Sequence, residues 1–259
     1  MQDKIIGRPI RLNRQMLRVK ENKDYAEVVF IGDCHYGSPQ FDKKRFENML
    51  AYCLENRLYV FLMGDLIEVG TKTSVGSGVY EQEFVGQTQF ERMVDMLTPL
   101  AEEKLILGTL GGNHCKRIYI ATGVNIAKMF ARELRVPYLG DACWNQFRVG
   151  KQIYTIYSLH GRSGARFDGT ALLALERISA SFNGDLVVCG HSHKCINSIV
   201  ITQDVRYNQV IEHKKHLLIT GSYLKYDGGY AQEAGLSISK LGSPKVRFYS
   251  TEHNIVISW

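Results

Sequence analysis

Five short polar clusters follow or separate the apolar runs of this chain, and most of them open with glycine. In order, they are Gly32-Asp33-Cys34-His35, Gly64-Asp65, Gly112-Asn113-His114, His160-Gly161 and Gly190-His191-Ser192-His193. Apolar runs that end near glycine are typical of buried parallel strands. Because open α/β sheets bind ligands at the carboxyl ends of their strands, we expect the polar clusters to meet in space.

The clusters contain residue types that bind pairs of divalent metal ions. Five of the eight histidines of the chain lie in them, beside two aspartates and one asparagine. Imidazole suits first-row transition metals better than it suits magnesium or calcium. Two such ions about 3.5–4 Å apart can clamp a phosphoryl group and generate hydroxide near neutral pH. The composition of the clusters therefore predicts a site for two metal ions.

In order and spacing, the clusters resemble the motifs of the calcineurin-like metallophosphoesterases, which are D-x-H, G-D, G-N-H, a lone histidine and G-H-x-H. They extend from Asp33 to His193, so the resemblance covers most of the chain. One block alone would mean little, but five in order are hard to reach by chance. The resemblance implies a four-layer αββα sandwich of two mixed β-sheets flanked by helices, formed by a single catalytic domain over residues 1–259.

The resemblance also implies a role for each polar residue. The first metal ion would be held by Asp33, His35 and His193. The second would be held by Asn113, His160 and His191. Asp65 would bridge the two ions, and His114 would assist the leaving group or stabilise phosphoryl charge as a protonated, non-ligating imidazole. Manganese is the expected metal, with iron, nickel and zinc as alternatives.

Each of these residues also has a structural interpretation. An aspartate after glycine, such as Asp33 or Asp65, is often only a turn residue or a helix cap. A single histidine such as His160 could be a hydrogen-bonded core residue. The ordered set of clusters is what favours metal binding. The three histidines outside the clusters are expected to be structural or surface residues, and they are His213, His216 and His253.

Two residues beside the clusters bear on the surroundings of the metals. Cys115 follows His114 at a position where relatives often carry an acidic residue, which puts any role of an acid there in doubt. Glu68 lies where many relatives have an acidic residue. It could orient a metal ligand, or it could be a solvated carboxylate at the start of a helix, and the sequence leaves both interpretations open.

The six cysteines are expected to be free thiols, because a chain of this size does not need disulfides. Four of them lie in or beside the metal clusters, so thiolate ligation remains the alternative. These four are Cys34, Cys115, Cys189 and Cys195.

Strands and helices are expected to alternate along the first part of the chain. β-branched and aromatic runs predict strands at 27–31, 58–62 and 105–107. Apolar residues at three-and-four spacing predict helices around 46–54, 90–97, 126–134 and 172–182, with the second bent or ended at Pro99. A second sheet is expected from strands at 146–149, 153–159, 185–188, 197–202, 205–211, 217–220 and 246–259.

Composition indicates a globular protein that is not embedded in a membrane. The chain is 45% hydrophobic and 22% charged, which is ordinary for globular proteins. No apolar stretch approaches the ~18 residues that cross a bilayer, and residues 1–8 lack the apolar core of a secretion signal. We therefore expect a cytoplasmic protein without a membrane partner.

Charge favours a polyanionic partner, since the net charge is +6. The N-terminal segment and the residues after the metal clusters are basic, although a solvated basic face is the alternative. These residues are Arg8, Arg11, Arg14, Arg18, Lys20, Lys116, Arg117, Arg162, Arg166 and Lys194. Residues 70–89, with Tyr80 and Phe84, are expected to form a long loop near the metals that stacks a base or contacts another subunit.

The resemblance thus implies hydrolysis of phosphodiester bonds by in-line attack of a metal-bridging hydroxide, with DNA or RNA as the specific substrate prediction. The motif pattern is nearest to the phosphodiesterase and DNA-repair exonuclease branch, without its capping domain. The alternatives are a small-molecule phosphomonoesterase or cyclic-nucleotide phosphodiesterase and, from a different class, a protein-binding scaffold. A homodimer is left open.

Overall fold

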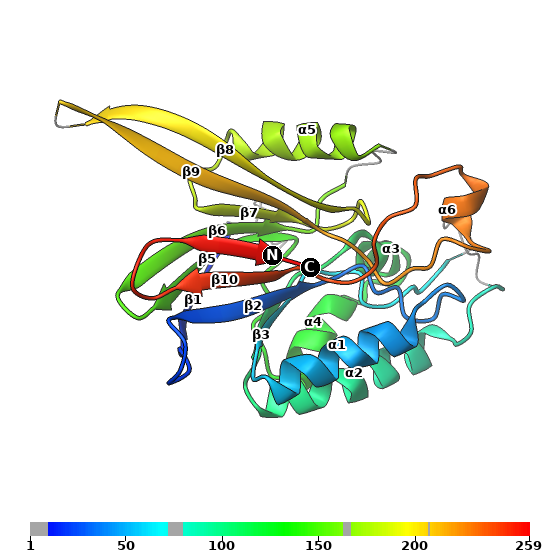
Figure 1. Ribbon diagram of the computed structural model, residues 1–259. Coiled ribbons are helices and arrows are strands. Elements are labelled where there is room, and N and C mark those ends of the chain that lie inside the picture. Colours follow the sequence, from blue (N-terminus) through cyan, green and yellow to red (C-terminus); the bar gives the residue numbers. More distant parts are fainter. Residues whose placement is uncertain (1–9, 72–79, 163–166, 207) are drawn as a thin grey trace, which may run out of the picture.

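Two β-sheets stack face to face, and helices cover their outer faces (Figure 1). The structure, a computed structural model, describes residues 10–71, 80–162, 167–206 and 208–259. Its layers confirm the predicted αββα sandwich of two mixed sheets. The assignment of residues 1–259 to one catalytic domain stays a prediction.

The first sheet has five strands in the order β11-β10-β2-β3-β4. The central strands β2 (Tyr25–Ile31), β3 (Tyr59–Leu62) and β4 (Ile106–Thr109) run parallel. The strands β10 (Lys245–Tyr249) and β11 (Ile255–Ser258) add antiparallel neighbours on the side of β2. Because β2 and β3 are buried on both faces, they read as continuous apolar runs rather than as alternating ones.

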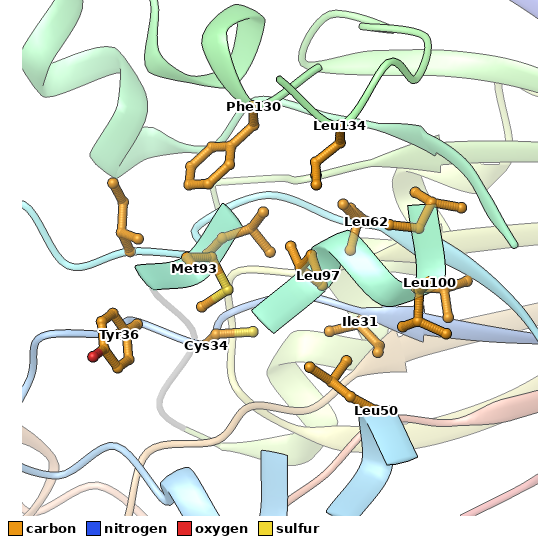
Figure 2. Packing of buried hydrophobic residues seen from close by; sticks show 14 of the residues in the cluster. Ile31, Cys34, Tyr36, Leu50, Leu62, Met93, Leu97, Leu100, Phe130 and Leu134 are labelled. Carbon is orange, nitrogen blue, oxygen red and sulfur yellow. The ribbon is translucent and has the colours of Figure 1, made fainter. Parts of the chain in front are cut away.

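Three helices cover the outer face of this sheet, namely α1 (Lys43–Glu55), α2 (Gly86–Glu102) and α4 (Ile126–Glu133). Figure 2 shows the resulting core, in which Met93 and Leu97 of α2 and Phe130 of α4 lie among the side chains of Ile31 and Leu62. Both Met93 and Leu97 are fully buried. The apolar stripes that predict helices therefore serve to build the core.

The second sheet has six strands in the order β1-β5-β6-β7-β9-β8. Its strands are β1 (Arg11–Leu17), β5 (Ala142–Val149), β6 (Gln152–Leu159), β7 (Leu186–Cys189), β8 (Cys195–Arg206) and β9 (Gln209–Thr220). Helix α5 (Asp168–Ser179) covers its outer face. Aromatic side chains such as Phe30, Phe61, Phe147 and Phe248 fill the space between the two sheets. The two sheets thus share one core.

Several elements differ from the sequence-based expectation. Residues 205–211 are not a strand of their own, because Val205 pairs with Val210 and the chain turns between them. Asn208 adopts a left-handed φ of 60° there, which asparagine tolerates. Strands β10 and β11 divide the expected strand 246–259 and join the first sheet instead of the second. Helix α2 continues past Pro99 to Glu102, so the proline does not end it.

Three elements had no counterpart in the prediction, namely β1, α3 (Asn113–Thr122) and α6 (Tyr230–Glu233). Part of the basic N-terminal segment, Arg11–Leu17, forms β1, whose partner β5 lies about 130 residues further along the chain. Within the described residues, none of the helices has the length and apolar character needed to cross a membrane.

Candidate metal centre

All five polar clusters lie at one end of the sandwich, where the parallel strands of both sheets end. Asp33 follows β2, Asp65 follows β3, and Asn113 begins α3 directly after β4. On the second sheet, His160 follows β6, and the pair His191 and His193 follows β7. The carboxyl ends of parallel strands form the binding edge of open α/β sheets. The fold therefore brings together all the residues that the resemblance implies as ligands.

The backbone at these residues is strained. Five of them adopt left-handed φ angles between 46° and 67°, namely Asp33, His35, Asp65, His191 and His193. Such conformations cost on the order of 1–3 kcal/mol each outside glycine and gather at functional sites. The neighbouring glycines leave the necessary room, since a Cβ atom at Gly112 would lie 2.0 Å from Asp65 Oδ1. The fold therefore tolerates locally unfavourable backbone conformations that orient these side chains toward one site.

The first half of the centre consists of Asp33, His35 and His193. His35 Nε2 lies 3.1 Å from His193 Nε2 and 3.9 Å from Asp33 Oδ1. His193 Nε2 lies 3.5 Å from the same carboxylate oxygen. His35 Nδ1 donates to Glu68 Oε2 at 2.9 Å, which leaves a lone pair on Nε2 in the neutral ring. A carboxylate oxygen and two imidazole nitrogens thus face one point.

The second half consists of Asp65, Asn113, His160 and His191. His160 Nε2 lies 3.0 Å from Asp65 Oδ2 and 2.9 Å from Asn113 Oδ1. His191 Nδ1 lies 2.8 Å from the same amide oxygen. His160 Nδ1 donates to the carbonyl of Met63 at 3.0 Å, so its Nε2 also presents a lone pair in the neutral ring.

This arrangement fits metal ions because carboxylate, amide and imidazole acceptor atoms converge on it. Asp33 Oδ1 and Asp65 Oδ2 are buried and accept no hydrogen bond, and the groups nearest to them include the imidazole nitrogens of His193 at 3.5 Å and His160 at 3.0 Å. A buried, unpaired carboxylate oxygen is costly unless a cation neutralises it. Three groups of possible ligand atoms lie within 4.8 Å of one another, namely Asp33/His35/His193, His35/Asp65/His114 and Asp65/His160/His191. Because Asp65 and His35 each occur in two groups, the geometry suits adjacent ions.

The pKa values of the site reflect the same need for positive charge. Burial acts to lower the pKa of His160, but the charge and hydrogen bond of Asp65, the charge of Asp33 and the Met63 carbonyl together raise that pKa to about 10. Burial acts in the opposite direction on Asp65, yet the surrounding imidazoles hold its pKa well below the usual range. The buried carboxylates therefore attract whatever cation is available.

His114 lies against both halves. Its backbone N–H donates to Asp65 Oδ1 at 3.0 Å, and its Nδ1 donates to the carbonyl of Glu68 at 2.6 Å. Burial, reinforced by the neighbouring His35, lowers the pKa of His114 to about 4. This low pKa favours the neutral ring before substrate binds, and the role of His114 as a protonated imidazole stays a prediction. Nε2 is the ring nitrogen left for a proton or a substrate.

Glu68 orients a proposed ligand, so the structure decides between its two sequence-based interpretations. Its side chain is buried, holds His35 Nδ1 and lies in no helix. Burial acts to raise the pKa of Glu68, but the hydrogen bond to His35 and the positive charges of His35, His114 and Arg117 together lower it, so the carboxylate stays charged. The backbone carbonyls of Met63 and Glu68 orient His160 and His114, and no side-chain pattern could have indicated these two contacts.

The thiols and the outer histidines do not belong to the centre. All six cysteines are free, and burial raises the pKa of Cys115 and of Cys189 to about 12, which disfavours thiolates. His253 pairs with Asp185 and stacks on Tyr154, as expected of a structural residue.

The basic residues near the clusters have different surroundings. Lys194 is buried and pairs with Asp168 and Ser237, so it is not an exposed cation at the rim of the site. Arg117 is half-buried, and its Nη1 has no hydrogen-bond partner among the described residues. Lys116 and Arg162 are exposed, whereas Arg8 and Arg166 lie outside the described residues.

The expected loop over 70–89 is only partly a loop. Residues 86–89 form the first turn of α2, and buried Gln89 accepts a hydrogen bond from the N–H of Val69. Phe84 stacks on Tyr36 and lies beneath Arg92, so its ring is already packed. Tyr80 is 93% exposed, and residues 72–79 lie outside the described residues.

Solved structures that resemble this one include a metallophosphoesterase, a predicted phosphoesterase and a Vps29. A metallophosphoesterase of Sphaerobacter thermophilus is 14% identical, with 90% of this chain and 86% of that chain covered and a TM-score of 0.41. A predicted phosphoesterase of Streptococcus pneumoniae is 12% identical, with 90% and 88% covered and a TM-score of 0.40. Vps29 of Entamoeba histolytica, solved with Zn²⁺, is 12% identical, with 90% and 97% covered and a TM-score of 0.37. No protein-family model and no curated protein matches this chain.

Proposed function

We propose that this chain is a phosphoesterase that binds two divalent metal ions and hydrolyses phosphodiester bonds. The observation that supports this most strongly is the convergence of two buried carboxylate oxygens without a hydrogen bond, Asp33 Oδ1 and Asp65 Oδ2, with imidazole nitrogens from both sheets. Bound at this point, two cations would activate a water molecule and neutralise charge on a phosphoryl group. A protein-binding scaffold would gain nothing from holding these acceptors in strained backbone.

The residues of this chain would hold and orient the reacting groups. Glu68 and the Met63 carbonyl keep the proton of His35 and of His160 on Nδ1, so that each Nε2 can bind metal. Asp65 lies between the two halves and is the proposed bridge. His114, fixed through Nδ1, can take up or return a proton at the reacting centre through Nε2.

Within this proposal, the finer choice of substrate is a nucleic acid. Arg117 lies on α3, four residues after Asn113, with a buried Nη1 that has no partner among the described residues. A guanidinium in this state suits a phosphate oxygen. The exposed cations Lys116 and Arg162, which flank the ligand segments in sequence, would add contacts to a phosphate backbone.

The test is turnover of a chromogenic phosphodiester by manganese-reconstituted protein, beside the matching phosphomonoester. Asp65→Asn should abolish turnover, and His213→Ala, which removes an exposed histidine outside the centre, should leave it unchanged. Diester turnover that disappears only in Asp65→Asn supports the proposal, and cleavage of DNA and RNA oligonucleotides then tests the finer choice. Preference for the monoester would favour the small-molecule alternative. If the metal-loaded protein turns over none of these esters, the proposed phosphoesterase activity is refuted.

A further inference from the structure

The six-stranded sheet ends in a long strand, β8, whose outer edge meets no other strand among the described residues. β8 pairs with β9 without a register shift from Cys195 to Arg206, and the two strands extend beyond the rest of the sheet (Figure 1). An edge strand presents a row of backbone N–H and C=O groups that can pair with another strand. The length and regularity of β8 make it a template for such pairing.

The other three sheet edges are blunted in the ways that proteins use to prevent pairing. β1 carries Arg11 and Arg14, and the edge strands β4 and β11 have only four residues each. β8 differs, because residues 195–203 include no charged residue, proline or glycine. Ile199 and Ile201 are 48% and 54% exposed on this strand. This edge is therefore unprotected against pairing.

The exposed segment of β8 has a palindromic order of side-chain types. It is Asn197-Ser198-Ile199-Val200-Ile201-Thr202-Gln203. If two copies pair antiparallel about Val200, each carboxamide meets a carboxamide, each hydroxyl meets a hydroxyl, and Ile199 meets Ile201. The pleat agrees with this register, because residues two apart along a strand share a face. This near-palindromic order of residue types matters only if the strand that pairs with β8 is β8 of a second copy.

We propose that two copies of this chain form a dimer through their β8 edges, with the two-fold axis at Val200. The two six-stranded sheets would join into one continuous sheet through their antiparallel β8 strands. The Ile199 and Ile201 side chains of both copies would form one apolar cluster. Cys195 Sγ contacts the carbonyl of Lys240, so the segment around Lys240 lies at the base of β8 and pairing would begin at Asn197. This interface is independent of the proposed activity.

Disulfide trapping tests the register. In a Cys195→Ser background, Val200→Cys places two thiols directly opposite each other across the axis, with Cα atoms about 4.5–5.5 Å apart, within disulfide range. Thr202→Cys is the matched control on the same face, because two copies of residue 202 would lie about 14 Å apart. The five other cysteines are buried. We expect Val200→Cys to give a covalent dimer under mild oxidation while Thr202→Cys stays monomeric. Equal trapping of both variants would overturn the proposed register.

Sedimentation equilibrium tests the interface in the unmodified chain. We expect a reversible dimer that Ile201→Glu weakens by at least about tenfold, because each glutamate would face the apolar cluster. Val210→Glu is the control, since Val210 is 65% exposed on the same hairpin but lies on β9, away from the edge. A monomer at all concentrations, or a dimer that tolerates Ile201→Glu, would contradict the proposal. In the latter case the subunits meet elsewhere.

Discussion

The two halves of the metal centre orient their histidines by different means. In the half with Asp33 and His193, the side-chain carboxylate of Glu68 holds His35. In the half with Asn113 and His191, the backbone carbonyl of Met63 holds His160. A carboxylate partner makes the imidazole more basic and can be removed by substitution, whereas a carbonyl is part of the fold. A substitution at Glu68 can therefore change the basicity of His35 in the first half. The orientation of His160 in the second half is fixed by the backbone.

The largest effect is expected on substitution of Asp65, because this residue belongs to both halves of the centre. Because its carboxylate lies in ligand groups of both halves, Asp65→Asn should lower the occupancy of both metal ions together with activity. Metal content after gel filtration, measured by mass spectrometry, checks this. Retention of two ions per chain by the variant would mean that Asp65 is not the bridge.

His114 should affect chemistry without affecting either half. His114→Ala should lower turnover by about 10²–10⁴-fold, the usual contribution of a general acid or base, while both metal ions remain bound. Steady-state kinetics and metal analysis of the same preparation check this prediction. A metal-free variant would show that His114 acts as a ligand, as its place in one of the three ligand groups allows.

Glu68→Gln should separate the two halves. Loss of a carboxylate partner of a metal-binding histidine typically costs about 10–100-fold in affinity, and here the loss should fall only on the half that contains His35. Metal titration by calorimetry should then resolve one weakened and one unchanged site. Equal weakening of both sites would show that the halves are not independently oriented.

Metal addition should produce the smallest effect, a gain in stability. At a free metal concentration 100 times Kd, binding contributes about 2.7 kcal/mol per site. For a protein of this size, that gain corresponds to a rise in Tm of about 5–11 °C. Differential scanning calorimetry with manganese and with EDTA checks it, and Asp33→Asn should remove the part of the gain that comes from the first half. An unchanged Tm in excess manganese would contradict metal binding at this centre.

The sequence predicts local features well and nonlocal ones poorly. The strands before Asp33 and Asp65 and the apolar stripes of α1, α2 and α4 are local patterns, so their residues indicate them directly. The pairing of β1 with β5, and the return of β10 to β2, join segments over 100 residues apart that no short pattern encodes. The turn at Asn208 interrupts the strand expected over 205–211, and no glycine or proline marks it in the sequence.

The centre shows the same division. The motifs place Asp33, His35, Asp65, Asn113, His160, His191 and His193 in one site, and the structure brings these residues together. The role of Glu68 could not be decided from sequence, because it depends on which side chain is buried beside His35. The lowered pKa of His114 is equally a result of burial, which the residue type alone does not reveal.

The position of the centre at the seam between the sheets has a mechanical consequence. Each half draws side chains from both sheets, since Asp33 and Asp65 follow strands of the first sheet and His160 and His193 follow strands of the second. A bound ion would therefore act as a cross-link between the layers and close long loops of chain, as a metal clip does. Without the ions, the two layers should open locally more often. Amide hydrogen exchange in the shared core should therefore accelerate first at this end of the sandwich.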